Sequence, residues 1–222
     1  MEALFKPKTV AVFGASANSA KIGYRIVENL LQGGFEGTLY PINPNGGEIF
    51  GLPMLPSIDD AAEEVDLAVI AIPARYVLDA VESCGKKGVK HAVVISSGFS
   101  EVGHAEEEQR LVETASRYGM RILGPNVFGI YSDAVHMNAT FGPRGIVSGH
   151  VAIVTQSGAL GIAMIGKTAE ESLGLSAVVS VGNKADLDEA DLLEYLGQDE
   201  NTRCLLYTSD AADEEDSVDL GG

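Results

Sequence analysis

Basic residues are scarce in this sequence. Lysine and arginine together number 15, against 32 aspartates and glutamates, which gives a formal net charge of −17. Such a surface repels the phosphates of nucleic acids and of anionic membranes, so we expect neither as a partner. The sequence also lacks an apolar run long enough to span a membrane, and its first residues, MEALFKPK, do not form a signal peptide. These absences predict a cytoplasmic protein.

Cysteine is rare as well, and histidine is scattered. The two cysteines, Cys84 and Cys204, have no metal-binding spacing and are too few for a disulfide framework, so we expect two small core residues in a reduced protein. No metal-binding pair occurs among the four histidines, which are His91, His104, His136 and His150. The sequence therefore predicts no metal site and no catalytic histidine.

Apolar residues, by contrast, are plentiful and follow a regular order. They make up 45% of the chain, which suffices for a full core. Strand patterns alternate with helical patterns. The strands are expected within residues 9–16, 37–44, 65–73, 90–99 and 120–126, and the helices within residues 22–34, 74–87 and 106–119. Because parallel strands need crossover helices, residues 1–130 are predicted to form a doubly wound α/β domain with a Rossmann-like parallel sheet.

The alternation then lapses and restarts. Residues 131–149 carry glycines, a proline and no clear period, and are expected to form a linker. Residues 150–207 hold three strand patterns, too few for a finished doubly wound sheet, so the second α/β domain is expected to be truncated. Residues 208–222 contain six acids and no base. They are either a solvated acidic tail or, as we favour, sequence foreign to an interrupted longer protein.

The turn after the first strand has the features of an anion site. Gly14 ends the strand and a helix begins near Gly23, so free backbone N–H groups and the helix dipole act at the same point. Ser16 and Ser19 can add hydroxyl donors, and Lys21 can add a positive charge. The glycine spacing does not fit G-x-G-x-x-G. A plain strand–helix turn is the alternative. If the anion site is correct, a side chain at either glycine should affect cofactor binding more than the apo fold.

The end of the second strand limits the kind of phosphate compound. Nicotinamide enzymes place an acid there to bind the ribose diol, but this strand ends in Asn43 and Asn45, and no acid occurs before Glu48. Uncharged amides tolerate a phosphate on the ribose. The pattern argues against NAD and permits NADP or coenzyme A (CoA), unless the two asparagines serve only the turn.

Later strand ends supply further small and polar residues at the edge where parallel sheets bind ligands. These are Ile72, Pro73, Ser96, Ser97, Gly98 and Asn126. Beyond them, Ser157 and Gly158 begin a helix. They match only half of a G-x-S-x-G elbow, because the first glycine is missing, so a serine hydrolase is not expected. This helix start either holds a second phosphate or is a simple N-cap.

Taken together, these motifs resemble a known family, the ADP-forming acid–CoA ligases, which are relatives of the succinyl-CoA synthetase α subunit. The resemblance covers residues 3 to about 207 and rests on the stretches VFGAS to KIG, YPINP, VDLAVIAIPA, GVKHAVVISSGFSEVG, RILGPN, NATF, TQSGALG and VGNKADLDEADLLEYL. It implies a CoA-binding domain followed by a succinyl-CoA-ligase-like, flavodoxin-like domain. The implied reaction converts acyl-CoA, ADP and phosphate to acid, CoA and ATP.

The resemblance also implies roles for single residues. CoA would be bound by Gly14, Ser16, Lys21, Ile22, Gly23, Asn43, Asn45, Ile72, Pro73, Ser96, Ser97 and Gly98. Asn126 would lie near the thioester, and Ser157 and Gly158 would hold the phosphate that attacks it. Relatives often carry a lysine where Asn45 stands.

Other parts of the family's reaction are implied to lie outside this chain. In the family a phosphohistidine carries the phosphoryl group to an ATP-grasp domain or β subunit, which handles ADP, ATP and Mg²⁺. No such histidine is expected here, and Thr-Ser-Asp at residues 208–210 replaces the Ile-Glu-Gly that follows LLY in relatives. The hypothesis is thus an inactive ligase fragment whose complete form is an oligomer. The alternatives are a CoA-sensing module of a ligase-like protein acetyltransferase and an NADP-linked oxidoreductase.

Overall fold

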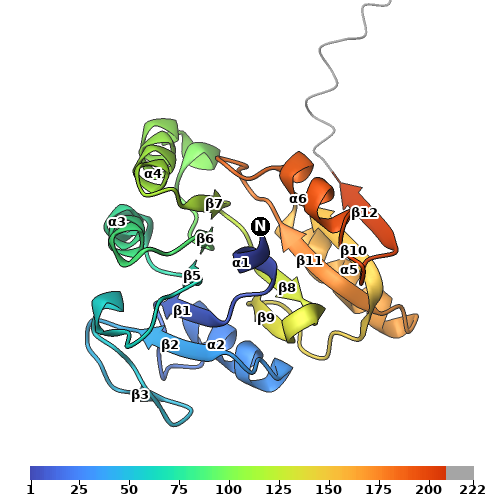
Figure 1. Cartoon of the computed structure of the whole chain (residues 1–222), viewed down its shortest axis with the longest axis horizontal. Helices are drawn as coiled ribbons and strands as arrows, with labels where there is room; N and C mark the ends of the chain where they lie inside the picture. Colours follow the sequence, from blue (N-terminus) through green and yellow to red (C-terminus); the bar gives the residue numbers. More distant parts are fainter. Residues whose placement is uncertain (209–222) are drawn as a thin grey trace, which may run out of the picture.

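The computed structural model describes residues 1–208, in which two five-stranded sheets lie side by side with helices around and between them (Figure 1). Apart from Thr208, the acidic segment predicted from the sequence lies outside the described residues. Within residues 1–208 no helix combines the length and the apolar character that a membrane crossing requires.

The first sheet is wholly parallel, as the sequence predicts. Its strands lie in the order β2 (Thr38–Ile42), β1 (Thr9–Phe13), β5 (Leu67–Ile70), β6 (His91–Val94) and β7 (Arg121–Leu123). From β1 the chain moves to one side to form β2 and then to the other side to form β5. The strand order therefore reverses between β1 and β5, and in sheets of this kind the reversal leaves a crevice at the carboxyl ends of the strands.

Three helices connect these strands. They are α2 (Ile22–Gly33), α3 (Val77–Lys87) and α4 (Ala105–Arg117). Helices α2 and α3 end at Gly34 and Gly88, which adopt the left-handed conformation that favours glycine. Two elements too short to show a sequence period complete this part of the chain, namely helix α1 (Glu2–Phe5) and a hairpin of β3 (Glu48–Ile49) and β4 (Leu52–Pro53).

The second sheet combines parallel and antiparallel strands. Its order is β12 (Cys204–Thr208), β10 (Ser148–Thr155), β11 (Leu175–Ser180), β8 (Gly129–Ser132) and β9 (Met137–Thr140), and its helices are α5 (Gly158–Glu170) and α6 (Glu189–Leu196). Residues 131–149, for which the sequence suggested a linker, contribute β9 and parts of β8 and β10. Strands β8 and β9 are as short as β5 and β6, but their sequences, Gly-Ile-Tyr-Ser and Met-Asn-Ala-Thr, lack the continuous apolar run that identifies β5 and β6 in the sequence.

The side chains of the inner strands, such as β1 and β11, alternate between two different cores. The core between the sheets contains Val10 and Val12 of β1, Ala177 and Val179 of β11, and the buried faces of α1, α2 and α6. The outer face of the first sheet packs on α3 and α4, and the outer face of the second sheet packs on α5. The molecule thus has five layers, and both sheets share the middle one (Figure 1).

The two cysteines differ in burial. Cys84 lies on α3 in the core beneath the first sheet, and burial raises the pKa of its thiol. Cys204 begins β12, the outermost strand of the second sheet within the described residues, and is exposed. The prediction of a core position is therefore wrong for Cys204. A strand pattern does not distinguish an inner strand from an edge strand, and the difference decides burial here.

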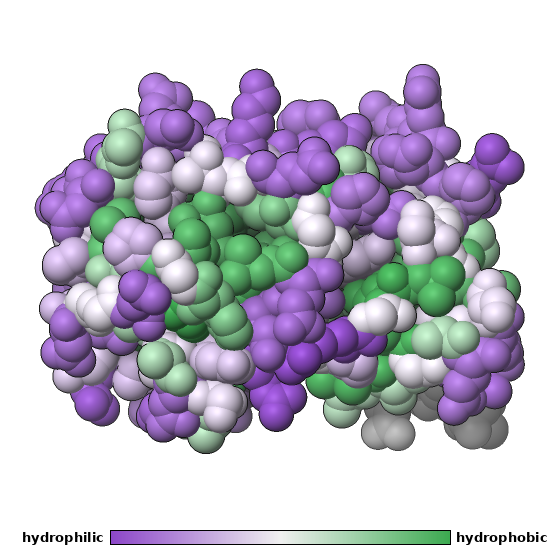
Figure 2. Space-filling view, turned by 90° about the horizontal axis from the view of Figure 1, so that it is seen from below, coloured by the Kyte–Doolittle hydropathy of each residue, from purple (hydrophilic) through white to green (hydrophobic). Residues whose placement is uncertain are grey.

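Apolar side chains gather in two areas on the face of the molecule seen from below (Figure 2). One area lies on the side of the first sheet and the other on the side of the second, with a band of hydrophilic residues between them. Large exposed apolar residues occur in both parts of the chain, among them Ile22, Phe50, Leu160 and Leu173. The apolar surface is therefore not continuous across this face.

Candidate functional site

An open cavity of about 740 Å³, the first cavity, lies at the carboxyl ends of β1, β5 and β6, where the strand order of the first sheet reverses. Every residue that the sequence predicted for CoA binding lines this cavity, with the exception of Gly98. These residues are Gly14, Ser16, Lys21, Ile22, Gly23, Asn43, Asn45, Ile72, Pro73, Ser96 and Ser97. The fold thus brings together side chains from four separate loops.

Gly14 and Gly23 bring three backbone segments into close contact beside the first cavity. Gly14 has a φ of +84°, and a Cβ there would collide with the carbonyl oxygen of Ala71. A Cβ on Gly23 would collide with the carbonyl oxygen of Gly14. The N–H of Gly14 is already in use, because it donates to the Ile42 carbonyl oxygen at 3.1 Å. The structure therefore changes the expectation for these glycines: a side chain at either position should disturb the apo fold as well as the cavity.

The first turn of α2 opens on the first cavity. Lys21 is the N-cap residue of this helix, and Lys21, Ile22 and Gly23 all line the cavity. The N–H groups of a first helical turn have no partner within the helix and carry the positive end of its dipole. Together with the Lys21 ammonium group they give the cavity a positively charged corner suited to a phosphate.

Hydrogen bonds fix the neighbouring loops without a ligand. The Ser16 hydroxyl oxygen accepts from the Asn18 N–H at 3.2 Å. The Asn43 side-chain amide donates to the Ala15 carbonyl oxygen at 2.8 Å, and the Asn43 side-chain oxygen accepts from the Asn45 N–H at 2.9 Å. Asn43 therefore holds two loops together, in agreement with the turn alternative, and shapes the cavity wall from that position.

Ser96 and Gly98 follow β6 and have structural contacts of their own. The Ser96 hydroxyl is buried and donates to the Ile72 carbonyl oxygen at 2.5 Å, which ties the ends of β5 and β6 together. The Gly98 N–H donates to Glu101 Oε1 at 2.5 Å and does not face the cavity. Ser97, which lies between them, lines the first cavity. Ser96 and Gly98 thus use their polar groups in structural bonds, whereas the Ser97 hydroxyl has no such bond in the described residues.

A second cavity of about 660 Å³ adjoins the first and lies between the two parts of the chain. The two cavities share Ile22, Ile95 and Ser97. The second cavity holds the remaining predicted site residues, which are Asn126, Ser157 and Gly158. Apart from Gly98, the predicted cofactor and acyl residues therefore lie along one continuous depression, and none of the four histidines lines either cavity.

The start of α5 forms one wall of the second cavity. Ser157 is the N-cap of this 13-residue helix, and its hydroxyl oxygen accepts from the Leu160 N–H at 3.3 Å. The Ser157 hydroxyl thus caps the helix, as one of the two alternatives from the sequence predicted. The backbone N–H groups of the first turn still point toward the helix start, so an anion in the second cavity would meet the positive end of the α5 dipole.

The Asn126 side chain contacts a polar cluster of Asn183, Glu101 and Glu108, none of which was predicted from the sequence. The Asn126 side-chain amide donates to Asn183 Oδ1 at 3.3 Å, and Asn183 in turn contacts Glu101 and Glu108. Asn126, Asn183 and Glu101 all line the second cavity. Asn183 follows β11 as Ser157 follows β10, so the strand-end rule that was applied to the first sheet would have identified it in the second.

Glu101 stays ionised in this cluster. Partial burial pushes the pKa of its carboxyl up, but hydrogen bonds from the Gly98 N–H, the Asn183 amide and the Phe99 N–H outweigh this effect and hold the pKa below its ordinary value of 4.5. Because an ionised carboxylate only accepts hydrogen bonds, Glu101 fixes which end of the Asn183 amide faces it.

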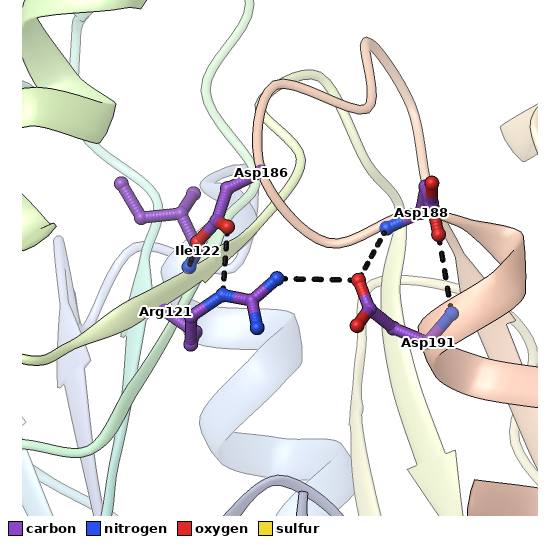
Figure 3. Close-up of polar contacts among 5 residues, drawn as sticks. All are labelled: Arg121, Ile122, Asp186, Asp188 and Asp191. Atoms are coloured by element: carbon purple, nitrogen blue, oxygen red, sulfur yellow. Dashed lines mark hydrogen bonds and ion pairs between the residues drawn. The ribbon is translucent and has the colours of Figure 1, made fainter. Parts of the chain in front are cut away.

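A second network joins the two parts of the chain away from the cavities (Figure 3). Arg121 Nε pairs with Asp186 Oδ1 at 2.7 Å, and its terminal nitrogen pairs with Asp191 Oδ2 at 3.2 Å. The other oxygen of Asp186 accepts from the Ile122 N–H at 2.7 Å. Asp191 also belongs to the capping box at the start of α6, where it exchanges hydrogen bonds with Asp188. The end of the first sheet is thus attached to the first turn of α6.

Two family profiles match the chain. The first, described as a CoA binding domain, matches residues 8–133, and the second, described as a succinyl-CoA ligase like flavodoxin domain, matches residues 148–217. The first profile covers more than half of the chain. Together they confirm the α/β fold class that the sequence predicts, with a CoA-binding, Rossmann-like part followed by a flavodoxin-like part.

Several curated proteins are similar to this chain. The acetate–CoA ligase [ADP-forming] I subunit alpha of Pyrococcus furiosus is 55% identical over 212 residues, which is 93% of this chain and 46% of the relative. The acetate–CoA ligase [ADP-forming] I of Archaeoglobus fulgidus is 48% identical over 93% of this chain and 30% of its own length. The chain thus spans about half or less of the length of these relatives.

A solved structure is similar as well. The apo form of the dinucleotide forming acetyl-coenzyme A synthetase 1 of Ca. Korarchaeum cryptofilum superposes with a TM-score of 0.91 at 52% identity, over 93% of this chain and 45% of that one. The same protein has also been solved in complex with phosphate and ADP. These similarities confirm the resemblance that the sequence motifs predicted.

Proposed function

The chain belongs to the CoA binding domain family, and we propose that it is the CoA- and acyl-CoA-binding part of an ADP-forming acid–CoA ligase. The whole enzyme would convert acyl-CoA, ADP and phosphate to acid, CoA and ATP. The observation that carries the proposal is the continuous depression, which runs from the charged start of α2, past Ser97, to Asn126 and the start of α5. An elongated thioester with phosphates at one end fits such a depression.

In the proposed complex each part of the depression binds one part of the ligand. The phosphates of CoA lie at the start of α2 beside Lys21, where N–H groups and a positive charge converge. The pantetheine arm passes Ser97 and Ile22, which both cavities share. The thioester then reaches the second cavity beside Asn126. Residues 1–130 would supply the CoA site, and residues 150–207 would supply the phosphate site.

The second cavity suits the first chemical step. A phosphate held at the start of α5 would attack the acyl carbon, the carbon–sulfur bond would break, and CoA would leave as a thiolate, which gives an acyl phosphate. Negative charge would develop on the carbonyl oxygen in the transition state, and an N–H of Asn126, which lines the cavity, would stabilise it. The dipole of α5 would hold the attacking anion.

Later steps would use parts that the resemblance places outside this chain. An ATP-grasp domain or β subunit would bind ADP, ATP and Mg²⁺, and a phosphohistidine would carry the phosphoryl group to it. In support, the Pyrococcus furiosus relative is named as a subunit alpha. We therefore propose such a partner, and an oligomer for the complete enzyme.

Calorimetric titration of the full chain tests the binding proposal. CoA and acetyl-CoA should each bind with measurable heat. NAD should not, because no acid occurs between β2 and Glu48 to bind a ribose diol, and NADP should not, because the glycines of the first turn lack the G-x-G-x-x-G spacing. Tight binding of NADH or NADPH without any heat from CoA would refute the proposal and favour an oxidoreductase.

A further inference from the structure

Asn183 holds an unusual position, because two carboxylates bind the same end of its side chain. Its Nδ2 donates to Glu101 Oε2 at 2.6 Å and to Glu108 Oε2 at 2.7 Å. On the basis of the proposed function, we propose that Asn183 is a positioning residue, which orients the amide of Asn126 toward the thioester of a bound acyl-CoA.

The two carboxylates decide the orientation of the Asn183 amide. Carboxylates accept hydrogen bonds and do not donate them, so the NH₂ group of Asn183 must face Glu101 and Glu108. Its oxygen then faces the other way and accepts from Asn126 Nδ2 at 3.3 Å. Rotation of the Asn183 amide by half a turn would place an oxygen against two negative charges and is excluded on electrostatic grounds.

Backbone groups hold the carboxylates in place. Glu101 accepts from the Gly98 N–H at 2.5 Å and from the Phe99 N–H at 3.2 Å. Glu108 accepts from the Ser100 hydroxyl at 2.7 Å and from the Ser100 N–H at 3.2 Å. The loop after β6 thus fixes both acceptors, and the orientation of the Asn183 side-chain amide follows from them, while the Asn183 N–H donates to the Pro125 carbonyl oxygen at 3.0 Å.

The same arrangement determines what Asn126 can offer to a ligand. One N–H of its side chain is used by Asn183, and its backbone N–H donates to the Ser96 carbonyl oxygen at 3.0 Å. The second side-chain N–H is left for the cavity that Asn126 lines. A hydrogen-bonded chain therefore runs from two carboxylates through Asn183 to the amide that would meet the acyl carbonyl oxygen, and each bond in it polarises the next.

The cluster also links the two parts of the chain, so a purely structural role must be distinguished from positioning. Glu101 and Glu108 belong to the segment between β6 and β7, whereas Asn183 follows β11. A structural link alone would affect CoA and acetyl-CoA equally when it is removed. A positioning residue affects only the ligand that carries the acyl group.

The test is calorimetric titration of the full chain with CoA and with acetyl-CoA, together with thermal unfolding. The parent chain should prefer acetyl-CoA. Asn183→Ala should weaken acetyl-CoA binding about three- to tenfold, the range of one neutral hydrogen bond, and leave CoA binding unchanged. Asn126→Ala should give the same loss, and the double variant should lose no more than either single one. Asn201→Ala, an exposed asparagine that lines neither cavity, is the matched control and should change neither affinity.

Three results would overturn the inference. They are equal losses for both ligands in Asn183→Ala, additive losses in the double variant, and a parent chain that binds CoA but does not prefer acetyl-CoA. If Asn183→Ala does not fold, Asn183→Ser, which cannot reach both carboxylates, should show the same selective loss. A parent chain that binds neither ligand would refute the proposed function, and the inference with it.

Discussion

The two cavities differ in how the chain builds them. The first is lined entirely by residues 14–97, which belong to the first-sheet part of the chain, and close backbone contacts at Gly14 and Gly23 set its shape. The second is lined by residues from both parts of the chain. It also has a close backbone contact, because a Cβ on Gly182 would collide with the carbonyl oxygen of Pro125, but the side-chain bond between Asn126 and Asn183 forms part of its wall as well. The second cavity can therefore be altered at a single side-chain bond, whereas the backbone contacts of the first tolerate little change.

The largest effect is expected where backbone contact shapes the first cavity. In Gly23→Ala the new methyl group would collide with the carbonyl oxygen of Gly14, so we expect a loss of about 3 kcal/mol or more in the free energy of unfolding, together with loss of CoA binding. Gly166→Ala is the matched control, because Gly166 is also helical and a Cβ there would meet no atom within 4 Å outside its own helix backbone. It should stabilise the protein by about 0.5–1 kcal/mol.

Urea unfolding and calorimetric titration measure these two effects. A Gly23→Ala variant with parental stability that still binds CoA would show that the first cavity is not made by this contact.

Low pH should lower the free energy of unfolding through protonation of His91, the first residue of β6. This residue is 7% exposed with no hydrogen-bond partner for Nδ1, and burial, together with the chain's amino terminus and Arg121, lowers its pKa to about 4. Between pH 6.5 and 4 the unfolded chain binds a proton that the folded chain does not, so stability falls as the pH falls. The loss should reach about 3 kcal/mol across this range.

Urea unfolding at several pH values tests the role of His91, with His91→Gln as the comparison. The variant should show a flatter pH dependence between pH 6.5 and 4. The same slope in both proteins would assign the acid sensitivity to other groups.

Lys21→Ala tests the charged corner of the first cavity. Removal of this ammonium group should weaken CoA binding about three- to tenfold, and the difference from the parent should shrink in high salt, because surface charges are screened. Lys90→Ala is the control, since exposed Lys90 precedes β6 at the opposite edge of the sheet. Equal affinities for the parent and Lys21→Ala at low salt would contradict a phosphate contact.

The smallest effect is expected where side chains join the two parts of the chain. Arg121→Ala removes the pairs with Asp186 and Asp191 and should lower the free energy of unfolding by about 1 kcal/mol, the upper end for partly exposed pairs. CoA affinity should stay unchanged, because the network lies away from the first cavity. Lys86→Ala breaks the exposed pair with Glu82 and should have no measurable effect on stability. A large loss of CoA affinity in Arg121→Ala would show that the first cavity also depends on the contacts between the two parts of the chain.

The same contrast explains what could be predicted from the sequence. Residues of the first cavity follow apolar strands directly, so strand ends at Gly14, Asn43 and Ile72 identify a shared edge. Their grouping followed from local patterns and from the resemblance. The structural roles of Asn43 and Ser96 could not be predicted from the sequence, because their hydrogen bonds to neighbouring loops depend on which strands lie side by side.

The second cavity was predicted only in part: Asn126, Ser157 and Gly158 were identified from the sequence, but the contacts of its polar cluster were not. The contacts of Asn183 with Glu101 and Glu108 join residues 82 and 75 positions apart, and no local pattern encodes such a pairing. Strands β8 and β9 were missed because their sequences mix polar and apolar residues and lack the continuous apolar run of β5 and β6. The place of β8 in the second sheet depends on pairing with β11, which is distant in sequence, and β9 pairs with β8.

The packing of α2 has a consequence for motion. Its start forms the charged corner of the first cavity, while its other end packs on β9, where the buried Asn29 amide donates to the Thr140 carbonyl oxygen at 2.8 Å. If the two parts closed around a ligand like a clamshell, α2 would lose its packing against one of its neighbours. The two parts should therefore keep their relative positions when a ligand binds, and the ligand should enter a groove that is already open.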